Sequence, residues 1–535
     1  MFLDILKIKK QFPVFAAAFF AFAAIGSVLW YILCPSAAFF HSDCSDTIFW
    51  AQASYDGKTL FNPKFGYAAI LPFGGTLIMW PLVALFGVSM TAHRLGMVIF
   101  SLIFFGGIYL LSRALKFSES LSLTAVGLTA LVLCSSEKMR EIFYEHVIYY
   151  SISIVIICVL LALYVHFTEN INSYGKKRRI SLCLLIYAFT FMSALDGTQV
   201  ISCAVLPVVF AAGCEVLFSK EKLFSKSNIP AYSFCGLVMF ASIIGLAALK
   251  VQTANLGVGY AEAYSNYSDM GEWLNNFLKL PTQWFELFGV DAAYGMNIFS
   301  LESIINLIRI AAAMILGITP VAALIFIGRL DRPSKLLVYT HFGMTAVIMF
   351  GYIFGLLSAA NWRLSPIICT SILICIAGIR AMNPHIVLKR VSAGIMCVML
   401  LLCTVNLKTV TDMPANGVEN NHYYPVIQYL KSQGLEYGFS TFWHSQTITV
   451  LSDSEIRIAN TDINENGVTP CAFQTNKKWF EEQEGIDRYF LLCTLNELAT
   501  LMQTDDWHYF VDGPIEQLEF DGYVIFVFDN LSFLE

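Results

Sequence analysis

The stretch FFHSDCSDTIFWAQASYDGK (39–58) places acidic side chains directly after the first long apolar run of the chain. A carboxylate beside hydrocarbon is costly unless it has a partner or a function. Asp43 and Asp46 are therefore candidate catalytic bases, since a positioned carboxylate can take the proton from an attacking hydroxyl. Which of the two is the base stays open, because Asp46 is also placed to cap the helix that SDTIFWAQAS predicts.

A second acidic group stands in SSEKMREIFYEHVIYY (135–150), between two further apolar runs. Glu141 and Glu145 are candidate catalytic carboxylates, and Tyr144 and His146 are candidate substrate contacts. Glu141 and Glu145 also have the i, i+4 spacing of an ordinary solvated helix end, which is the competing interpretation.

Basic side chains that could hold a phosphate occur at the edges of other apolar runs. Arg94 lies in TAHRLGM, Arg363 lies in AANWRLSP, and Lys64 lies in NPKFGYAAILP. Because a guanidinium group can hold two phosphate oxygens at once, an anionic substrate is expected near these residues. The simpler interpretation of the two arginines is that they extend toward lipid headgroups.

The composition predicts a membrane protein with many spans. Of 535 residues, 57% are hydrophobic and only 13% are charged, and the mean hydropathy is +0.64. These values exclude a soluble or nucleic-acid-binding protein. The absence of a Gly-rich phosphate loop from the sequence disfavours a cytoplasmic enzyme that uses nucleotide sugars.

Charge divides the chain into two parts. Residues 412–535 hold 20 acidic and 5 basic residues, a net charge of −15, whereas the other 411 residues hold 19 acidic and 28 basic residues, a net charge of +9. We therefore expect a membrane domain over residues 1–411, with large outer loops at 35–90 and 250–304, and an acidic soluble domain over residues 412–535.

Eleven apolar runs are long enough to cross the roughly 30 Å of hydrocarbon, and the basic connections between them predict an N-terminus in the cytoplasm and an acidic tail outside. A twelfth run, 67–89, is interrupted by prolines and glycines and is expected to lie against the outer face. The alternative is that 119–136 is the run that fails to span. The predicted spans are 13–34, 91–112, 119–136, 146–166, 180–196, 198–218, 229–249, 305–328, 336–357, 362–380 and 386–407.

The acidic tail reads as a small α/β domain. YYPVIQYLKSQ has a helical pattern, whereas QTITVLSD, RYFLLCTL and DGYVIFVFDN have strand-like patterns. The string TFWHSQ (441–446) is distinctive, but the sequence gives no mechanism for it.

The order of these features resembles the GT-C class of integral-membrane glycosyltransferases. A first span is followed by an outer loop that opens on an acidic residue, and then by a broken apolar segment and FG-x5-HRLGMVIFSLIFFGGIYLLSRALKFS (86–118). The sequence is similar in particular to the protein O-mannosyltransferase and lipid A aminoarabinose transferase branch. This resemblance implies an all-α polytopic bundle, with the small α/β domain on the extracytoplasmic side of the cell membrane.

The resemblance also implies roles for the candidate residues. Asp43 best matches the catalytic base, Glu141 or Glu145 matches the acidic residue of the second outer loop, and Arg94 matches the arginine of the second span. NPKFGYAAILP stands where the family carries a Lys-Pro-Pro or His-Pro-Pro segment, and Asp-Cys (43–44) stands where it carries Asp-Glu. These departures put the role of Lys64 in question and leave Asp46 as an alternative to Asp43.

The function expected from these features is glycosyl transfer. The implied donor is a polyprenyl-phosphate sugar and the acceptor is a lipid, glycan or protein at the outer face, with inversion at the anomeric carbon. The alternatives are a transporter or flippase of lipid-linked saccharides and a polysaccharide polymerase. A transporter would carry charges near the middle of the membrane, and a polymerase usually has an arginine-rich outer loop, whereas 250–304 contains no arginine. No cofactor is expected. Metal dependence stays open, because the acidic residues suffice to hold a divalent ion but lack a diagnostic metal-ligand spacing.

Overall fold

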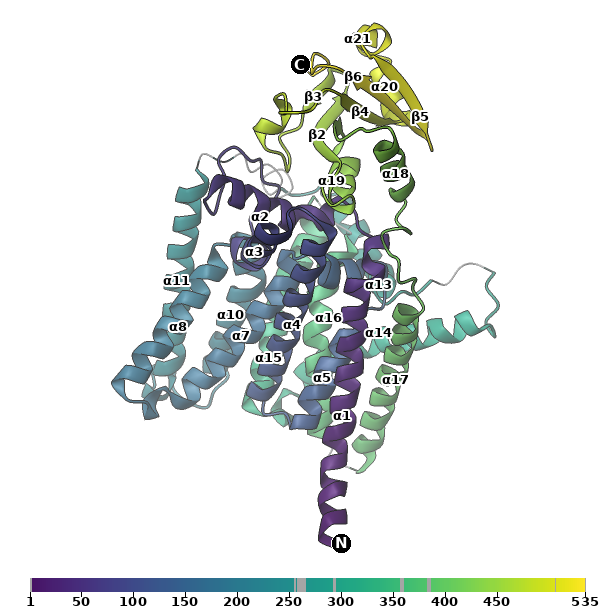
Figure 1. Ribbon diagram of the computed structural model, residues 1–535. Coiled ribbons are helices and arrows are strands. Elements are labelled where there is room, and N and C mark those ends of the chain that lie inside the picture. The colour runs from purple at the N-terminus through teal and green to yellow at the C-terminus, as the bar shows by residue number, and fades with distance from the viewer. Residues whose placement is uncertain are drawn as a thin grey trace.

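The computed structural model describes residues 2–254, 256, 266–291, 295–356, 360–382, 386–505 and 507–534, with side chains described from residue 11 onward. A bundle of helices forms the body of the protein, and a small mixed domain covers one end of it (Figure 1). The N-terminus lies at the opposite end of the bundle from this domain (Figure 1).

Within the described residues, nine helical segments are long and apolar enough to cross a membrane. Their backbone N–H and C=O groups are paired inside each helix, which hydrocarbon requires. The chain is therefore a multi-pass membrane protein. The nine segments are α1 (Phe2–Leu33), α4 (Met90–Ala114), α7 (Tyr149–Asn170), the run of α9 (Thr198–Val200), η6 (Ile201–Val205) and α10 (Leu206–Leu217), α11 (Ile229–Thr253), α14 (Leu301–Ile325), α15 (Arg332–Phe354), α16 (Ser365–Met382) and α17 (Ile386–Thr411).

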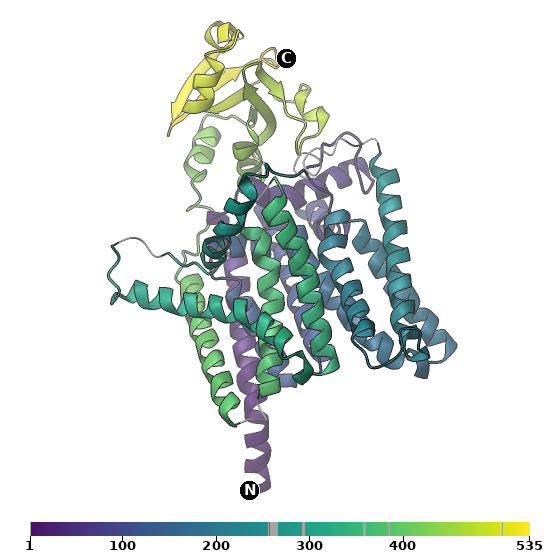
Figure 2. The same ribbon diagram turned by 180° about the vertical axis from the view of Figure 1, so that it is seen from behind.

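Two further helices run beside these nine, namely α5 (Glu119–Val132) and α8 (Lys176–Ala194). α5 is short, with 14 residues, but it packs against α1, α4 and α17 inside the bundle. This packing favours the prediction of eleven spans over the alternative in which 119–136 does not span. α14 runs obliquely across the back of the bundle (Figure 2) and packs on α16 and α17.

The break predicted in 67–89 is present. Pro72–Thr76 forms a π-helical turn (η3), and α3 (Leu77–Phe86) adds only ten residues. α3 lies with α2 (Asp46–Gly57) at the end of the bundle that carries the small domain (Figure 1). The segment is therefore broken where the prolines and glycines predicted, and it lies at the end of the bundle, as expected for a segment against the outer face.

Several short elements gather at the same end of the bundle. α6 (Glu137–Arg140) leads into the π-helical η4 (Glu141–Glu145), and α13 (Glu272–Leu287) packs against α15. Asn266 and Ser268 bond the backbone of residues 354–356. The 3-10 helices among the described residues are η1 (Pro35–Ala38), η2 (Ser42–Ser45), η5 (Ile171–Ser173), η7 (Lys226–Asn228), η8 (Ile327–Arg329), η9 (Asn361–Leu364) and η10 (Lys477–Phe480).

The C-terminal domain is built on a six-stranded sheet with strand order β3-β2-β1-β4-β6-β5. β1 pairs in parallel with β2 and β4, and the remaining pairs are antiparallel. The strands are β1 (Tyr437–Ser440), β2 (Arg457–Asn464), β3 (Gly467–Pro470), β4 (Tyr489–Thr494), β5 (Glu516–Phe520) and β6 (Tyr523–Phe528), and the helices are α18 (Tyr424–Ser432), α19 (Phe442–Leu451), α20 (Leu495–Leu501) and α21 (Trp507–Asp512).

The α/β prediction for the tail is confirmed, but one of its strand assignments is wrong. QTITVLSD lies mostly within α19, not in a strand. α19 connects β1 to the parallel strand β2, and a parallel pair needs a crossover connection, which is usually a helix. The β-branched residues of this stretch suggested a strand, but the packing of the crossover decides the local structure.

The C-terminal domain shares its apolar core with the bundle. On β4, Phe490 and Leu492 belong to the core that continues into the membrane body, whereas Leu491 and Cys493 face a second core on the other side of the sheet. This alternation is the period of two that strands impose. The sheet therefore lies between two apolar layers, and one of these layers joins it to the membrane body.

Candidate active site

The acidic residues of the two outer loops lie together at the domain-bearing end of the bundle. α1 ends at Leu33, and η2 and the start of α2 turn Asp43 and Asp46 back over the bundle. The π-helical turn η4 presents Glu141 and Glu145 between α5 and α7. The grouping that the sequence predicted is therefore present in the structure.

Glu141 is held by two cationic neighbours. The His41 Nε2 atom lies 3.6 Å from the Glu141 Oε2 atom, and Lys138 forms an ion pair with the same oxygen. Burial alone would raise the pKa of Glu141, but the hydrogen bond from His41 and the charge of Lys138 outweigh it and lower this pKa to about 2. Cys44 and then Glu141 raise the pKa of His41. Glu141 is therefore ionised and paired at neutral pH.

Asp43 is the open carboxylate of the group. It is half-buried, and within the described residues its side chain forms no hydrogen bond or ion pair. Burial raises its pKa above the ordinary value, with a further rise from Glu141 and opposing effects of His41 and Lys138. A half-buried carboxylate with a raised pKa and no fixed partner is suited to accept a proton.

Asp46 has a fixed partner from the C-terminal domain. The Gln474 side-chain amide donates a hydrogen bond of 2.7 Å to the Asp46 Oδ1 atom. Burial raises the pKa of Asp46 well above the ordinary value, and Asp43 raises it further, whereas the Gln474 bond lowers it. The orientation of the Asp46 carboxylate is thus fixed by a hydrogen bond, whereas that of Asp43 is not.

Glu145 lies below the surface of the site. It is buried and accepts a hydrogen bond from the Tyr31 hydroxyl of α1. Burial raises the pKa of Glu145 to about 7. The Arg140 guanidinium lies 5.4 Å from the centre of the Tyr31 ring. Glu145 is therefore placed to support the site from beneath.

The two neighbours of Glu145 that the sequence predicted as substrate contacts are both buried. The Tyr144 hydroxyl donates to the Ala130 carbonyl of α5 at 2.9 Å, which directs it into the bundle. Both ring nitrogens of His146 lack a hydrogen-bond partner within the described residues, and burial lowers the pKa of His146 to about 4. His146 is therefore neutral at pH 7.

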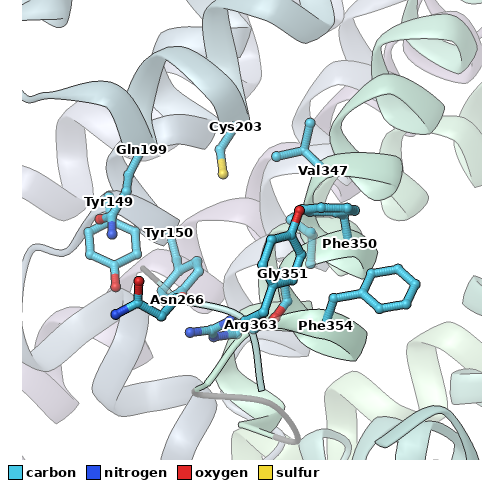
Figure 3. A pocket seen from close by; sticks show the side chains of 13 residues that line it. Tyr149, Tyr150, Gln199, Cys203, Asn266, Val347, Phe350, Gly351, Phe354 and Arg363 are labelled. Carbon is cyan, nitrogen blue, oxygen red and sulfur yellow. Dashed lines mark hydrogen bonds between the residues drawn. The ribbon is translucent and has the colours of Figure 1, made fainter. Parts of the chain in front are cut away.

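Arg363 lines a cavity of about 340 Å³ at the same end of the bundle (Figure 3). Its Nη1 atom donates to the Gly351 carbonyl at 2.8 Å, its Nε atom has no partner, and in the described part of the chain no carboxylate pairs with it. The cavity is lined by Tyr149, Tyr150, Gln199, Cys203, Asn266, Tyr267, Val347, Ile348, Phe350, Gly351, Phe354, Gly355 and Arg363. It is an apolar and aromatic space with one free cation.

Two contacts connect the Arg363 cavity to the acidic group. Tyr149 is within electrostatic range of both Arg363 and Asp46. The Lys138 Nζ atom, which pairs with Glu141, lies 5.1 Å from the ring centre of Trp362, the neighbour of Arg363. The acidic group and the Arg363 cavity are therefore neighbours at the domain-bearing end of the bundle, with Lys138 between Glu141 and Trp362.

Arg94 and Lys64 lie elsewhere, at the contact with the C-terminal domain. The Arg94 Nη2 atom donates to the Cys34 carbonyl at 3.2 Å, and in the same turn of α4 the Met90 N–H donates to the Asp453 carboxylate at 2.9 Å. Lys64 is exposed, and its carbonyl accepts from the Lys477 backbone at 3.1 Å. The structure does not bring either residue to Arg363, although the sequence predicted all three as donor contacts.

Several residues of the site carried no signal in the sequence. Gln474 lies in the tail, where nothing marked it as different from any other polar residue. Tyr31 and Tyr149 lie inside apolar runs, where aromatic residues are ordinary core. Within the described residues, no group of three or more His, Cys, Asp or Glu side chains is placed to hold a metal ion.

No family model matches this sequence, and no curated protein matches it. Among solved structures, the chain is similar to an Archaeoglobus fulgidus oligosaccharyltransferase crystallised with zinc and sulfate. The TM-score is 0.47 and the identity 12%, over 92% of this chain and 70% of that one. A second crystal structure of the same enzyme, tethered to an acceptor peptide with an NVT sequon, gives a TM-score of 0.46 and 10% identity, over 88% of this chain and 65% of that one. These similarities are too low to establish a function.

Proposed function

We propose that this protein is a GT-C-like glycosyltransferase that moves a sugar from a polyprenyl-phosphate donor to an acceptor hydroxyl. The observation that carries the proposal is that Asp43, a carboxylate without a fixed partner, lies at the same end of the bundle as a cavity lined by Arg363, a guanidinium without a carboxylate partner. Transfer from a lipid phosphate needs a base for the acceptor and a cation for the leaving phosphate.

The Arg363 cavity suits the phosphate end of a lipid donor. Arg363 supplies the charge, and the aromatic side chains of α7 and α15 supply apolar walls on either side of it (Figure 3). A guanidinium without a carboxylate partner can exchange its water contacts for phosphate oxygens. The prenyl chain would then extend along the bundle, where apolar side chains face the lipid.

In the proposed step, Asp43 removes the proton from the acceptor hydroxyl. The acceptor oxygen attacks the anomeric carbon from the face opposite the phosphate, and the bond between that carbon and the phosphate oxygen breaks. The products are the glycosylated acceptor, with inverted configuration, and polyprenyl phosphate. Glu141 keeps Lys138 and His41 beside Asp43, where their charges favour the ionised base.

The setting of the reaction follows from the same geometry. The site lies at the end of the bundle that carries the C-terminal domain, opposite the N-terminus (Figure 1). With the cytoplasmic N-terminus that the basic loops predict, the site and the C-terminal domain face the outside of the plasma membrane. The acceptor would therefore be a lipid, glycan or protein at that surface.

The proposal is tested by incubating the purified protein with a panel of polyprenyl-phosphate sugars and following release of polyprenyl phosphate. A transferase should consume at least one donor when an acceptor extract is present. A flippase of lipid-linked saccharides would instead move the labelled donor between the leaflets of liposomes without forming polyprenyl phosphate, and that result would overturn the proposal. A polymerase would extend one acceptor into a ladder of products, whereas a transferase adds one unit.

A further inference from the structure

The loop 471–476 of the C-terminal domain enters the membrane body beside α2. The Gln474 backbone N–H donates to the Gly66 carbonyl at 2.8 Å, and the Gly66 N–H donates to the Thr475 carbonyl at 3.0 Å. A Cβ atom at Gly66 would lie 1.7 Å from the Ala472 carbonyl oxygen. The approach is therefore so close that only glycine fits at position 66.

Gln474 is held at this contact by both its backbone and its side chain. It is fully buried, at 0% exposure, and its φ of 56° lies in the left-handed region that glutamine rarely adopts. Its own carbonyl accepts from the Gln446 side chain at 2.8 Å. The backbone bonds on either side of Gln474 maintain this conformation, so the direction of its side chain is fixed.

The chemistry of its neighbours fixes which way the Gln474 amide points. The Trp50 indole N–H donates to the Gln474 Oε1 atom at 2.8 Å, and the Gln474 Nε2 atom donates to the Asp46 Oδ1 atom at 2.7 Å. An indole N–H can only donate, so the Oε1 atom must face Trp50 and the amide NH2 group must face Asp46. The reverse orientation of the amide would lose the Trp50 bond.

We propose that Gln474 is a positioning residue of the active site, through which the C-terminal domain fixes the orientation of the Asp46 carboxylate beside Asp43. The proposal rests on the proposed function for the catalytic meaning of Asp46. It also makes the C-terminal domain a part of the active site, because removing that domain would leave Asp46 without its donor.

The loss of the Gln474 side chain is predicted to change the protonation of Asp46. A hydrogen bond donated to a carboxylate favours the ionised form, so losing it raises the pKa of that carboxyl. The other groups that face Asp46 are Asp43 and His41 from the same loop and Tyr149 from α7. None of these replaces a donor directed at the Oδ1 atom.

The test uses the full chain in detergent and two variants. Gln474→Gly removes the amide and suits the left-handed backbone, so it should fold. Asn421→Ala is the matched control, because Asn421 is another buried amide of the same domain contact. Asn421 donates to the Ala37 and Phe40 carbonyls, at 2.8 and 3.0 Å, and does not touch Asp46.

The readout is the rate at which a hydrophobic carbodiimide labels Asp46, measured across pH by mass spectrometry with fragment ions that separate Asp46 from Asp43. Carbodiimides react with protonated carboxyls, so the pH midpoint of labelling follows the pKa. In Gln474→Gly the midpoint should rise by about one to two pH units, the value of a hydrogen bond to a charged group. In Asn421→Ala it should stay at the wild-type value.

An unchanged midpoint in Gln474→Gly would overturn the proposal, and so would an equal shift in Asn421→Ala, which would reduce Gln474 to a docking contact. Sugar transfer is measured in parallel, as the readout of the proposed function. If the midpoint shifts as expected but the wild type transfers no sugar from any donor, the positioning role stands and the proposed function fails.

Discussion

Asp43 and Asp46 are three residues apart, yet their surroundings differ in a way that assigns them different tasks. Asp43 has no fixed partner within the described residues, whereas Asp46 is bonded to Gln474. A general base has to exchange its proton during each turnover, which an open carboxylate can do without first losing a bond. This difference favours Asp43 as the base and Asp46 as the carboxylate that shapes its surroundings.

Replacing Arg363 with Ala should weaken binding of polyprenyl phosphate by about tenfold to a hundredfold, the range expected for losing hydrogen bonds to a charged group. Arg363→Lys should restore little of this affinity if the contact is bidentate. Binding is measured by titrating the purified protein with polyprenyl phosphate. Arg94→Ala is the matched control, because Arg94 bonds the Cys34 carbonyl away from the cavity. An equal loss of affinity in both variants would contradict the assignment of Arg363.

Glu145 should make the thermal stability of the protein depend on pH. Its pKa of about 7 in the folded protein lies above the ordinary value of 4.5, so the folded state keeps a proton that the unfolded chain releases. Stability should therefore fall as pH rises between these two values, by about 1.4 kcal/mol per pH unit. Glu145→Gln stays neutral, so its Tm should exceed that of the wild type by more at pH 8 than at pH 5.

Glu141→Gln is the control for this experiment, because its sign is opposite. The pKa of Glu141 is lowered to about 2 in the folded protein, so its contribution to stability is present above the ordinary value of 4.5 and is lost as pH falls toward 2. Glu141→Gln should therefore be less stable than the wild type at pH 8. A constant difference in Tm between Glu145→Gln and the wild type from pH 5 to 8 would contradict the account of Glu145.

At the scale of elements, Asp196 fixes the broken segment that carries α3. Its carboxylate accepts from the Phe73 backbone at 2.8 Å and from the Gly74 backbone at 3.1 Å. Asp196→Ala would leave both N–H groups unpaired, which should cost about 1–3 kcal/mol. Asp196→Asn keeps an oxygen acceptor and should cost less. The measurement is thermal unfolding in detergent, and equal stability of the Ala and Asn variants would contradict the anchoring role.

Replacing Gly74 of the same η3 turn with a larger residue should also lower the stability of the protein. A Cβ atom there would lie 2.8 Å from the Ile152 Cγ1 atom and 3.2 Å from the Asp196 Oδ2 atom, whereas a Cβ at the helical Gly106 would meet nothing within 4 Å. Gly74→Ala should therefore lower the Tm, and Gly106→Ala should leave it unchanged or raise it. The reverse order of the two variants would show that the η3 turn is not closely packed.

How far the sequence predicts each element depends on whether the governing force is local. The apolar runs and the break in 67–89 were predictable, because length, hydropathy, Pro and Gly act within the segment itself. QTITVLSD was assigned wrongly, because its helix is imposed by the parallel pairing of β1 with β2, which is a long-range feature. The role of TFWHSQ could not be predicted for the same reason, because its contact is far away in the sequence. The Ser42 hydroxyl, about 400 residues earlier, donates to the Phe442 and Trp443 carbonyls of α19.

The site residues, too, were predictable only where the signal is local in the sequence. The acidic group and Arg363 could be identified because they are charged residues at the ends of apolar runs, where a charge is costly without a partner or a function. The position of Arg94 could not be predicted, because its contact is the end of α1. Gln474 could not be found at all, since its importance arises only when the C-terminal domain docks on α2.

At the scale of the whole molecule, the bundle and the C-terminal domain form one unit with a shared apolar core. The two ends of the chain lie at opposite ends of the bundle (Figure 1). Reporter fusions after Asp412 and at Lys177 should therefore report opposite sides of the membrane, with Asp412 outside and Lys177 in the cytoplasm. Activity of both reporters on the same side would contradict the eleven-span arrangement.

The most direct test of the central claim is the rate of sugar transfer by Asp43→Asn, with donor binding followed separately. Asparagine has nearly the shape of aspartate but cannot take the acceptor proton, so transfer should fall by about 10²–10⁴-fold while polyprenyl-phosphate binding stays at the wild-type level. Asp46→Asn should be milder, because the Gln474 contact can still find an oxygen acceptor. Transfer at the wild-type rate by Asp43→Asn, with Asp46→Asn inactive, would show that the base has been misassigned. Full activity of both variants would contradict the account of the site.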